Sequence, residues 1–184
     1  MTDSPQDRER TYPDGRPLAG FGDRLLAYII DALIMGAVAM LIWVPALIWW
    51  FRRFAIELTR MDTSYNPSDQ IPAETVSAFI VGYLVLFGLI LAATLGISYV
   101  YLVEMSWRSG QTIGKRAMKL QVAPAEPGVE RSRMMFVKRW AVERVGGAFL
   151  PFFSYLDGLW QLWDKPLQQC LHDKAAHTVV VKIG

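Results

Sequence analysis

The chain has 184 residues, of which 53% are hydrophobic and 20% charged, and its formal net charge at pH 7 is +2. This apolar content is too high for an ordinary soluble domain, and the small net charge argues against a nucleic-acid-binding protein. The length leaves no room for an appended catalytic domain, and a single cysteine, Cys170, excludes an internal disulfide.

The first 17 residues are polar, mixed in charge and interrupted by prolines. Such a segment buries too little apolar surface to become ordered, so residues 1–17 are expected to form a flexible cytoplasmic tail. Residues 18–183 are expected to form one membrane domain.

Two apolar runs, residues 25–51 and 76–103, each exceed the roughly 20 residues that cross a hydrocarbon core about 30 Å thick. They predict two transmembrane helices. The first run is longer than the roughly 7–15 apolar residues of a cleavable signal, so we expect it to remain in the mature protein. Residues 52–75, which contain Asn66-Pro67 and Pro72, predict a connecting loop.

Small residues recur at four-residue spacing in both runs and define what we call the small-residue ridge. Its members are Ala32 and Gly36 in the first run and Gly88, Ala92 and Gly96 in the second. Such ridges let helices approach closely, so they predict helix packing. The contact could join the two spans of one chain or the spans of two chains in a homo-oligomer.

Basic residues are unevenly distributed around the spans. The segment between the two runs holds three, whereas residues 104–144 hold nine. The positive-inside rule therefore places residues 104–144 in the cytoplasm, and two crossings place the N-terminus there as well. We expect Lys115, Arg116 and Lys119 to meet anionic lipid headgroups.

The apolar region 134–163 is interrupted by Gly146-Gly147 and Pro151 and carries charges in both halves. A break at Pro151 leaves two pieces that are each too short to cross, which favours a re-entrant or interfacial helical hairpin over a third crossing. Residues 118–123 and 178–183 have the character of strands and predict a two-strand pairing that keeps the C-terminus cytoplasmic. The expected fold is an all-α membrane protein with two transmembrane helices, this hairpin and a small cytoplasmic strand pair.

Asp31 is a carboxylate inside the first span, where a charge is costly unless it is paired, neutralised or hydrated. Arg24 lies about two turns earlier on the same helix face. One interpretation makes Asp31 an intramembrane proton or cation site; the other makes Arg24 and Asp31 part of a structural lock between helices, involving Arg139 or another cytoplasmic group.

The motif at residues 110–116 lacks the spacing of a phosphate-binding loop, so nucleotide binding is not expected. Cys170, His172 and His177 match no familiar zinc pattern, and no metal or cofactor is expected. Asp173 is expected to accept backbone or Lys/Arg hydrogen bonds in the turn before the last strand. No arrangement of residues points to catalysis, so a non-enzymatic protein is predicted.

Arg24, Asp31, the motif at residues 110–116 and the sequence at residues 172–181 together resemble the RDD family of membrane proteins. That family is named for one arginine and two aspartates, and the resemblance transfers these letters to Arg24, Asp31 and Asp173, with Asp164 as the other candidate for the third. It implies a small cell-membrane module associated with transport or with larger assemblies.

Three hypotheses follow for the function. The first is a transport-related module for an ion or small ligand, with Asp31 as its site, which would require a homo-oligomer to form a pathway. The second is a membrane adaptor or assembly subunit that acts through a partner membrane protein. The third, a lipid-binding or lipid-modifying protein, depends only on the aromatic residues Trp140, Trp160 and Trp163 beside basic ones.

Overall fold

The computed structural model describes residues 11–62, 72–150 and 152–183. The chain forms two compact units. Met1–Leu33 and Ser98–Gly184 make up one, which we call the terminal unit, and Ile34–Ile97 makes up the other, the helical-pair unit.

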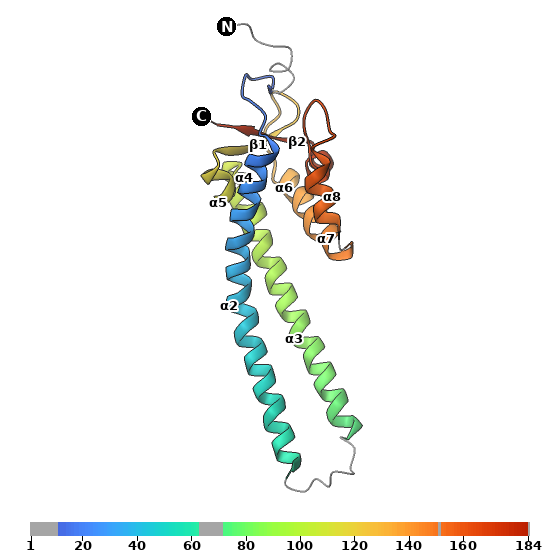
Figure 1. Cartoon of the computed structure of the whole chain (residues 1–184). Helices are drawn as coiled ribbons and strands as arrows, with labels where there is room; N and C mark the ends of the chain where they lie inside the picture. Colours follow the sequence, from blue (N-terminus) through green and yellow to red (C-terminus); the bar gives the residue numbers. More distant parts are fainter. Residues whose placement is uncertain (1–10, 63–71, 151, 184) are drawn as a thin grey trace. The chain divides into compact units, whose positions relative to one another are not determined.

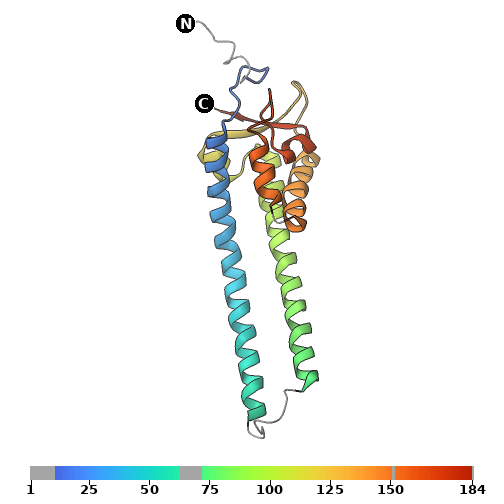
Figure 2. The same ribbon diagram turned by 45° about the vertical axis from the view of Figure 1, so that its right-hand side comes forward.

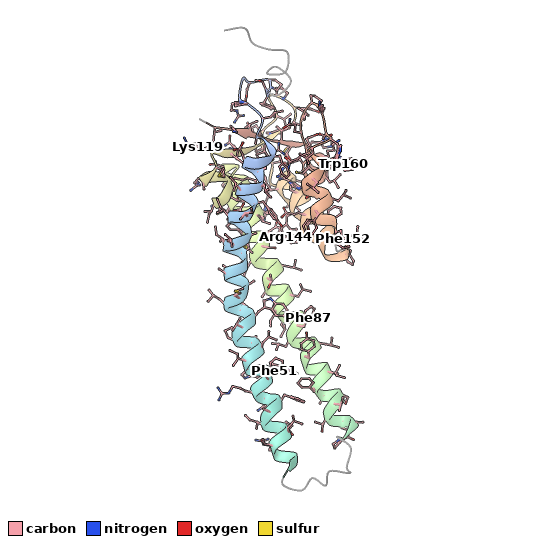
Figure 3. All side chains as sticks on the ribbon, viewed as in Figure 1. Phe51, Phe87, Lys119, Arg144, Phe152 and Trp160 are labelled. Atoms are coloured by element: carbon pink, nitrogen blue, oxygen red, sulfur yellow. The ribbon has the colours of Figure 1, made fainter. Side chains whose placement is uncertain are left out.

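Two long apolar helices account for both predicted spans. They are α2 (Phe21–Asp62) and α3 (Ala73–Tyr99), and α3 continues through a π-helical turn, η1 (Val100–Glu104), into α4 (Met105–Ser109) (Figure 1). Both are long and apolar enough to cross a membrane. Most of their large apolar side chains are exposed, Phe51 and Phe87 among them (Figure 3), as expected for surfaces that face lipid.

Helix α2 extends 11 residues beyond the predicted end of the first span. The part of the predicted loop from Arg52 to Asp62 is therefore helical, and residues 63–71 lie outside the described residues. No glycine or proline occurs between Arg52 and Asp62 to stop the helix. The loss of hydrophobicity after Phe51 ends the apolar run but not the backbone hydrogen bonding.

Aromatic rings join the two helices of the helical-pair unit. Phe79 lies 4.2 Å from Phe54 and 4.9 Å from Trp50, measured between ring centroids. A Cβ atom at Gly82 would lie 2.5 Å from the Trp50 ring, so this indole occupies the space that the glycine leaves.

The small-residue ridge does not lie in that contact. All five of its residues are exposed, and a Cβ atom at Gly36, Gly88 or Gly96 would meet nothing within 4 Å. Gly88 lies nine residues after Phe79, which is about two and a half turns and therefore the opposite side of α3. Its glycines therefore make no close contact with the other span among the described residues, and contact of the ridge with a second chain stays a prediction.

The predicted strand pair is confirmed in the terminal unit. Strands β1 (Leu120–Pro124) and β2 (Thr178–Lys182) are antiparallel, with Val122 opposite Val180. Leu18 forms a bridge to Val181 on the free edge of β2, so the segment before the first span and the last strand are hydrogen-bonded neighbours. Both ends of the chain therefore meet on one small sheet.

Residues 11–17, predicted as part of a flexible tail, pack against the terminal unit. Thr11 forms a bridge to Pro17, and Tyr12 is buried, with its hydroxyl donating to the carbonyl of Pro124 at 3.0 Å. The ring of Tyr12 supplies apolar surface for this packing, which the average polarity of residues 1–17 does not indicate. Residues 1–10 lie outside the described residues.

The region predicted as a hairpin consists of short helices. These are α6 (Arg133–Trp140), a π-helical turn η2 (Ala141–Val145), α7 (Gly146–Phe149) and α8 (Phe153–Trp160), followed by α9 (Leu171–Ala176). In both ribbon views α6 and α7 lead away from the sheet and α8 returns beside them (Figures 1 and 2). The predicted break at Pro151 lies outside the described residues.

Exposed aromatic side chains lie on α8 and on the residues next to it. Phe149, Phe152, Tyr155 and Trp163 are each at least 70% exposed, and Figure 3 shows Phe152 and Trp160 there. Apolar rings on a segment too short to span the bilayer are typical of residence at the lipid interface. The fold is that of an all-α membrane protein with a minor two-strand sheet.

Candidate functional site

Asp173 is the centre of a buried ionic cluster in the terminal unit. It occupies the first turn of α9, where its Oδ2 accepts a hydrogen bond from the backbone N–H of Cys170 at 3.2 Å. The same oxygen accepts from Nη1 of Arg24 at 3.1 Å, and its Oδ1 accepts from Nη1 of Arg139. The residue is fully buried, so one carboxylate contacts two guanidinium groups away from water.

Separate elements hold the two arginines in place. Arg24, in the first turns of α2, also donates from Nε to the carbonyl of Ala19 at 3.1 Å. Arg139, on α6, also donates from Nη1 to the hydroxyl of Thr178 at the start of β2, at 2.6 Å. The cluster therefore ties α2, α6, α9 and β2 together through side chains far apart in the sequence.

Two opposing effects set the pKa of Asp173. Burial raises it, because the charged form loses its hydration, whereas electrostatic interactions with Arg139, His172 and Arg24 lower it. The arginines prevail, and the pKa of this carboxyl lies below its ordinary value. Asp173 is therefore an anion at neutral pH.

A second buried carboxylate, Asp157, lies beside the cluster. It comes from α8, is 3% exposed, and accepts the backbone N–H of His172 at 2.9 Å. Its other oxygen lies 2.6 Å from Nδ1 of the same histidine. This pair fastens the returning helix α8 to the start of α9.

Asp31 lies elsewhere in the terminal unit and binds the motif at residues 110–116. Its Oδ1 accepts from the Tyr101 hydroxyl at 2.5 Å and from the Gly114 N–H at 2.8 Å, and its Oδ2 accepts from the Thr112 hydroxyl at 2.5 Å. Thr112 is also the N-cap of α5 (Ile113–Ala117). Asp31 thus fixes the start of this short helix against α2.

The glycines of this motif permit the close approach. A Cβ atom at Gly114 would lie 2.2 Å from the carbonyl of Ala27 and 2.8 Å from the Asp31 carboxylate. Gly110 has a φ of +77°, a left-handed conformation that ends α4 and favours glycine. The motif is therefore a helix end followed by a docked turn.

Of the three residues expected at lipid headgroups, Lys115 is half-buried, whereas Arg116 and Lys119 are exposed. Burial and the charge of Arg139 lower the pKa of Lys115. The headgroup role of the three residues stays a prediction.

The structure brings together Arg24 and Asp173 and keeps Asp31 apart from them. Asp164, the other candidate for the family's third letter, forms an ion pair with Lys174 and accepts the backbone N–H of Gln169. Sequence reasoning did not assign Tyr101 or Asp157 to a site. Asp157 could have been recognised as a charged residue within an apolar segment, because such a charge requires a partner.

Cys170, His172 and Asp173 offer ligand atoms that lie within 4.8 Å of one another. A metal ion would have to compete with two guanidinium groups for Asp173, and burial raises the pKa of the Cys170 thiol, which disfavours the thiolate that a metal needs. This donor set does not suit a metal.

Comparison with curated proteins found no match, and neither did comparison with solved structures. The model of the RDD family matches residues 18–177, a range that contains Asp31, the cluster around Asp173 and both apolar helices. This match covers well over half of the sequence and agrees with the two membrane-spanning helices of the structure. The chain is therefore a membrane protein that belongs to the RDD family.

Proposed function

We propose that this chain is a non-enzymatic adaptor of the cell membrane that presents a rigid cytoplasmic unit to a partner membrane protein. The observation that carries the proposal is that Asp31 is held by hydrogen bonds from its own chain. Three donors of its own chain already occupy its two oxygens. A transport site has to exchange its ligand with water, whereas a carboxylate bound in this way stabilises a fixed arrangement.

The buried ionic cluster supports the same proposal. Asp173 joins four elements of the terminal unit, and replacing its partners by water would require the unit to open. Buried ion pairs of this kind contribute to a unique arrangement more than to net stability. A fixed arrangement is what a binding surface for another protein requires.

The proposed orientation places both ends of the chain in the cytoplasm. The bridge between Leu18 and Val181 keeps the segment before the first span beside the last strand. The nine basic residues in positions 104–144 favour the cytoplasmic side for the unit that contains them.

Native purification tests the proposal. The chain, tagged at its natural expression level and crosslinked in intact membranes, is expected to be recovered with one partner protein in a fixed ratio. Recovery of the chain alone, or only with other copies of itself, would contradict an adaptor role. The variant Asp173→Asn should lose the partner, whereas Asp23→Asn, which removes a partly exposed acid of the same unit, should retain it.

A transport module is the second candidate, and the pair of Asp157 and His172 is the observation that favours it. Chains of Asp and His side chains form the proton relays of pumps and transporters, and this imidazole lies 2.6 Å from a buried carboxylate. Proteoliposomes containing the purified chain, placed under a pH or sodium gradient, distinguish the candidates. The adaptor proposal expects no flux above empty vesicles; flux that Asp31→Asn or His172→Gln abolishes would establish transport instead.

A further inference from the structure

A basic pocket on the terminal unit is lined by neither Asp31 nor Asp173. It has a volume of about 500 Å³ and is lined by residues of the N-terminal segment, α4, β1 and the segment before α6. Small-molecule sites have volumes of about 300–1,000 Å³, so the pocket is large enough for a ligand. The residues that bind Asp31 or Asp173 do not line the pocket either.

Guanidinium groups dominate the charge of this pocket. Arg16, Arg108 and Arg131 line it, against one carboxylate, that of Glu130. Arg16 is compensated by Asp14, 2.6 Å away, and its Nη1 donates to Gln121 at 2.8 Å, so it is held in place. Within the described part of the chain no carboxylate pairs with Arg108 or Arg131, and the pocket keeps an excess of positive charge.

Arg131 is the residue that points to a ligand. Its Nη1 atom is buried and has no hydrogen-bond partner among the described residues. The atom lies so close to Gly110 that a Cβ atom there would be 2.1 Å from it, which fixes this end of the side chain over the backbone turn. Buried donors in native proteins are almost always bonded, so this guanidinium, which lines the pocket, has hydrogen-bonding capacity that the described residues leave unused.

The apolar residues that line the pocket indicate that the ligand has an apolar part besides its charged group. Trp107, Val122, Pro124 and Val129 form an apolar wall beside the arginines. Arginine binds phosphate through two parallel hydrogen bonds, and an indole face packs on apolar or ring-shaped groups. We propose that this pocket binds a phosphate group attached to an apolar moiety, with Arg131 and Arg108 as its ligands.

Two sources could supply such a group. Arg108 follows the second apolar helix and belongs to the last turn of α4, so an anionic phospholipid headgroup is one source. A water-soluble organic phosphate is the other. The chemistry of recognition is the same for both.

Calorimetric titration of the full chain in phosphatidylcholine nanodiscs tests the proposal for the soluble source, with phenyl phosphate and inorganic phosphate as probes. We expect saturable binding that is tighter for phenyl phosphate, because only this probe reaches the apolar wall. Arg131→Gln and Arg108→Gln should each weaken it at least tenfold. Lys138→Gln, which removes an exposed positive charge outside the pocket, is the matched control and should leave binding unchanged.

The lipid arm uses nanodiscs that contain phosphatidic acid. If the headgroup is the ligand, phosphatidic acid should raise the unfolding temperature of the wild type and Lys138→Gln but not of Arg131→Gln, while phenyl phosphate fails to bind. Absence of both effects would overturn the proposal, as would losses of equal size in Arg131→Gln and Lys138→Gln. Arg108→Gln, whose side chain is exposed, provides the same comparison if Arg131→Gln does not fold.

Discussion

The carboxylate of Asp173 neutralises only one of the two guanidinium groups that contact it. Arg24, Arg139 and Asp173 are each at least 91% buried. The surplus positive charge is spread over hydrogen bonds to backbone carbonyls and to Thr178. Removing the one anion would leave two buried cations facing each other.

Asp173→Asn should therefore lower the free energy of unfolding by about 3–5 kcal/mol, the cost of breaking a buried ion pair from one side. Denaturant titration in detergent micelles measures it. Asp23→Asn is the control: its ion pair with Lys182 is partly exposed and should contribute about 1 kcal/mol or less. Equal losses of unfolding free energy in the two variants would show that the buried ion pairs of Asp173 contribute no more to stability than an exposed pair.

The same carboxylate predicts how stability depends on pH. The pKa of Asp173 is below its ordinary value of 3.8 in the folded chain, so its contribution is complete above that value. As the pH falls below about 4, the unfolded chain binds the proton first, and the contribution is lost by the pH at which the folded carboxyl is protonated. The free energy of unfolding, measured at several pH values between 5 and 2, should fall less steeply with decreasing pH in Asp173→Asn than in the wild type.

At the scale of elements, the strand pair and the two apolar helices were predictable because each depends on local pattern. β1 and β2 have alternating or β-branched residues, and α2 and α3 have long apolar runs. The end of α2 was not predictable from hydropathy, since the helix continues through charged residues with good helix propensity.

The candidate site was predictable only in part. The costly charges Arg24, Asp31 and Asp173 stood out from their surroundings, but their partners did not. Arg24 and Asp173 are 149 residues apart, and Asp31 and Thr112 are 81 apart. No local spacing rule connects residues at such distances, so pairing Arg24 with Asp31 on one helix face was the natural but incomplete interpretation.

Asp31 should control the protection of the docked turn at residues 110–116. Hydrogen exchange of the Gly114 amide should accelerate strongly in Asp31→Asn, because the neutral amide accepts more weakly and its nitrogen cannot accept from Thr112. Tyr101→Phe removes one of the three donors and should accelerate it less. Exchange as slow as in the wild type in both variants would contradict the anchor role of Asp31.

At the scale of the whole molecule, the small-residue ridge is exposed and is therefore available to contact a second chain. Gly88→Leu should leave the unfolding free energy within about 0.5 kcal/mol, because the added side chain meets open space. If the ridge joins two chains, the variant should run as a monomer in crosslinking within native membranes. Leu89→Met, also exposed, is the control; an unchanged oligomer in Gly88→Leu would exclude the ridge from the interface.

The distance along the chain between Arg24 and its anion also constrains biosynthesis. The first helix enters the membrane while Asp173 has yet to leave the ribosome, and the arginine must wait for 149 more residues before its counter-charge exists. Until residue 173 has been synthesised, the guanidinium depends on water or phospholipid for solvation. A nascent chain released before Asp173 would keep an arginine without its counter-charge at the mouth of the first helix.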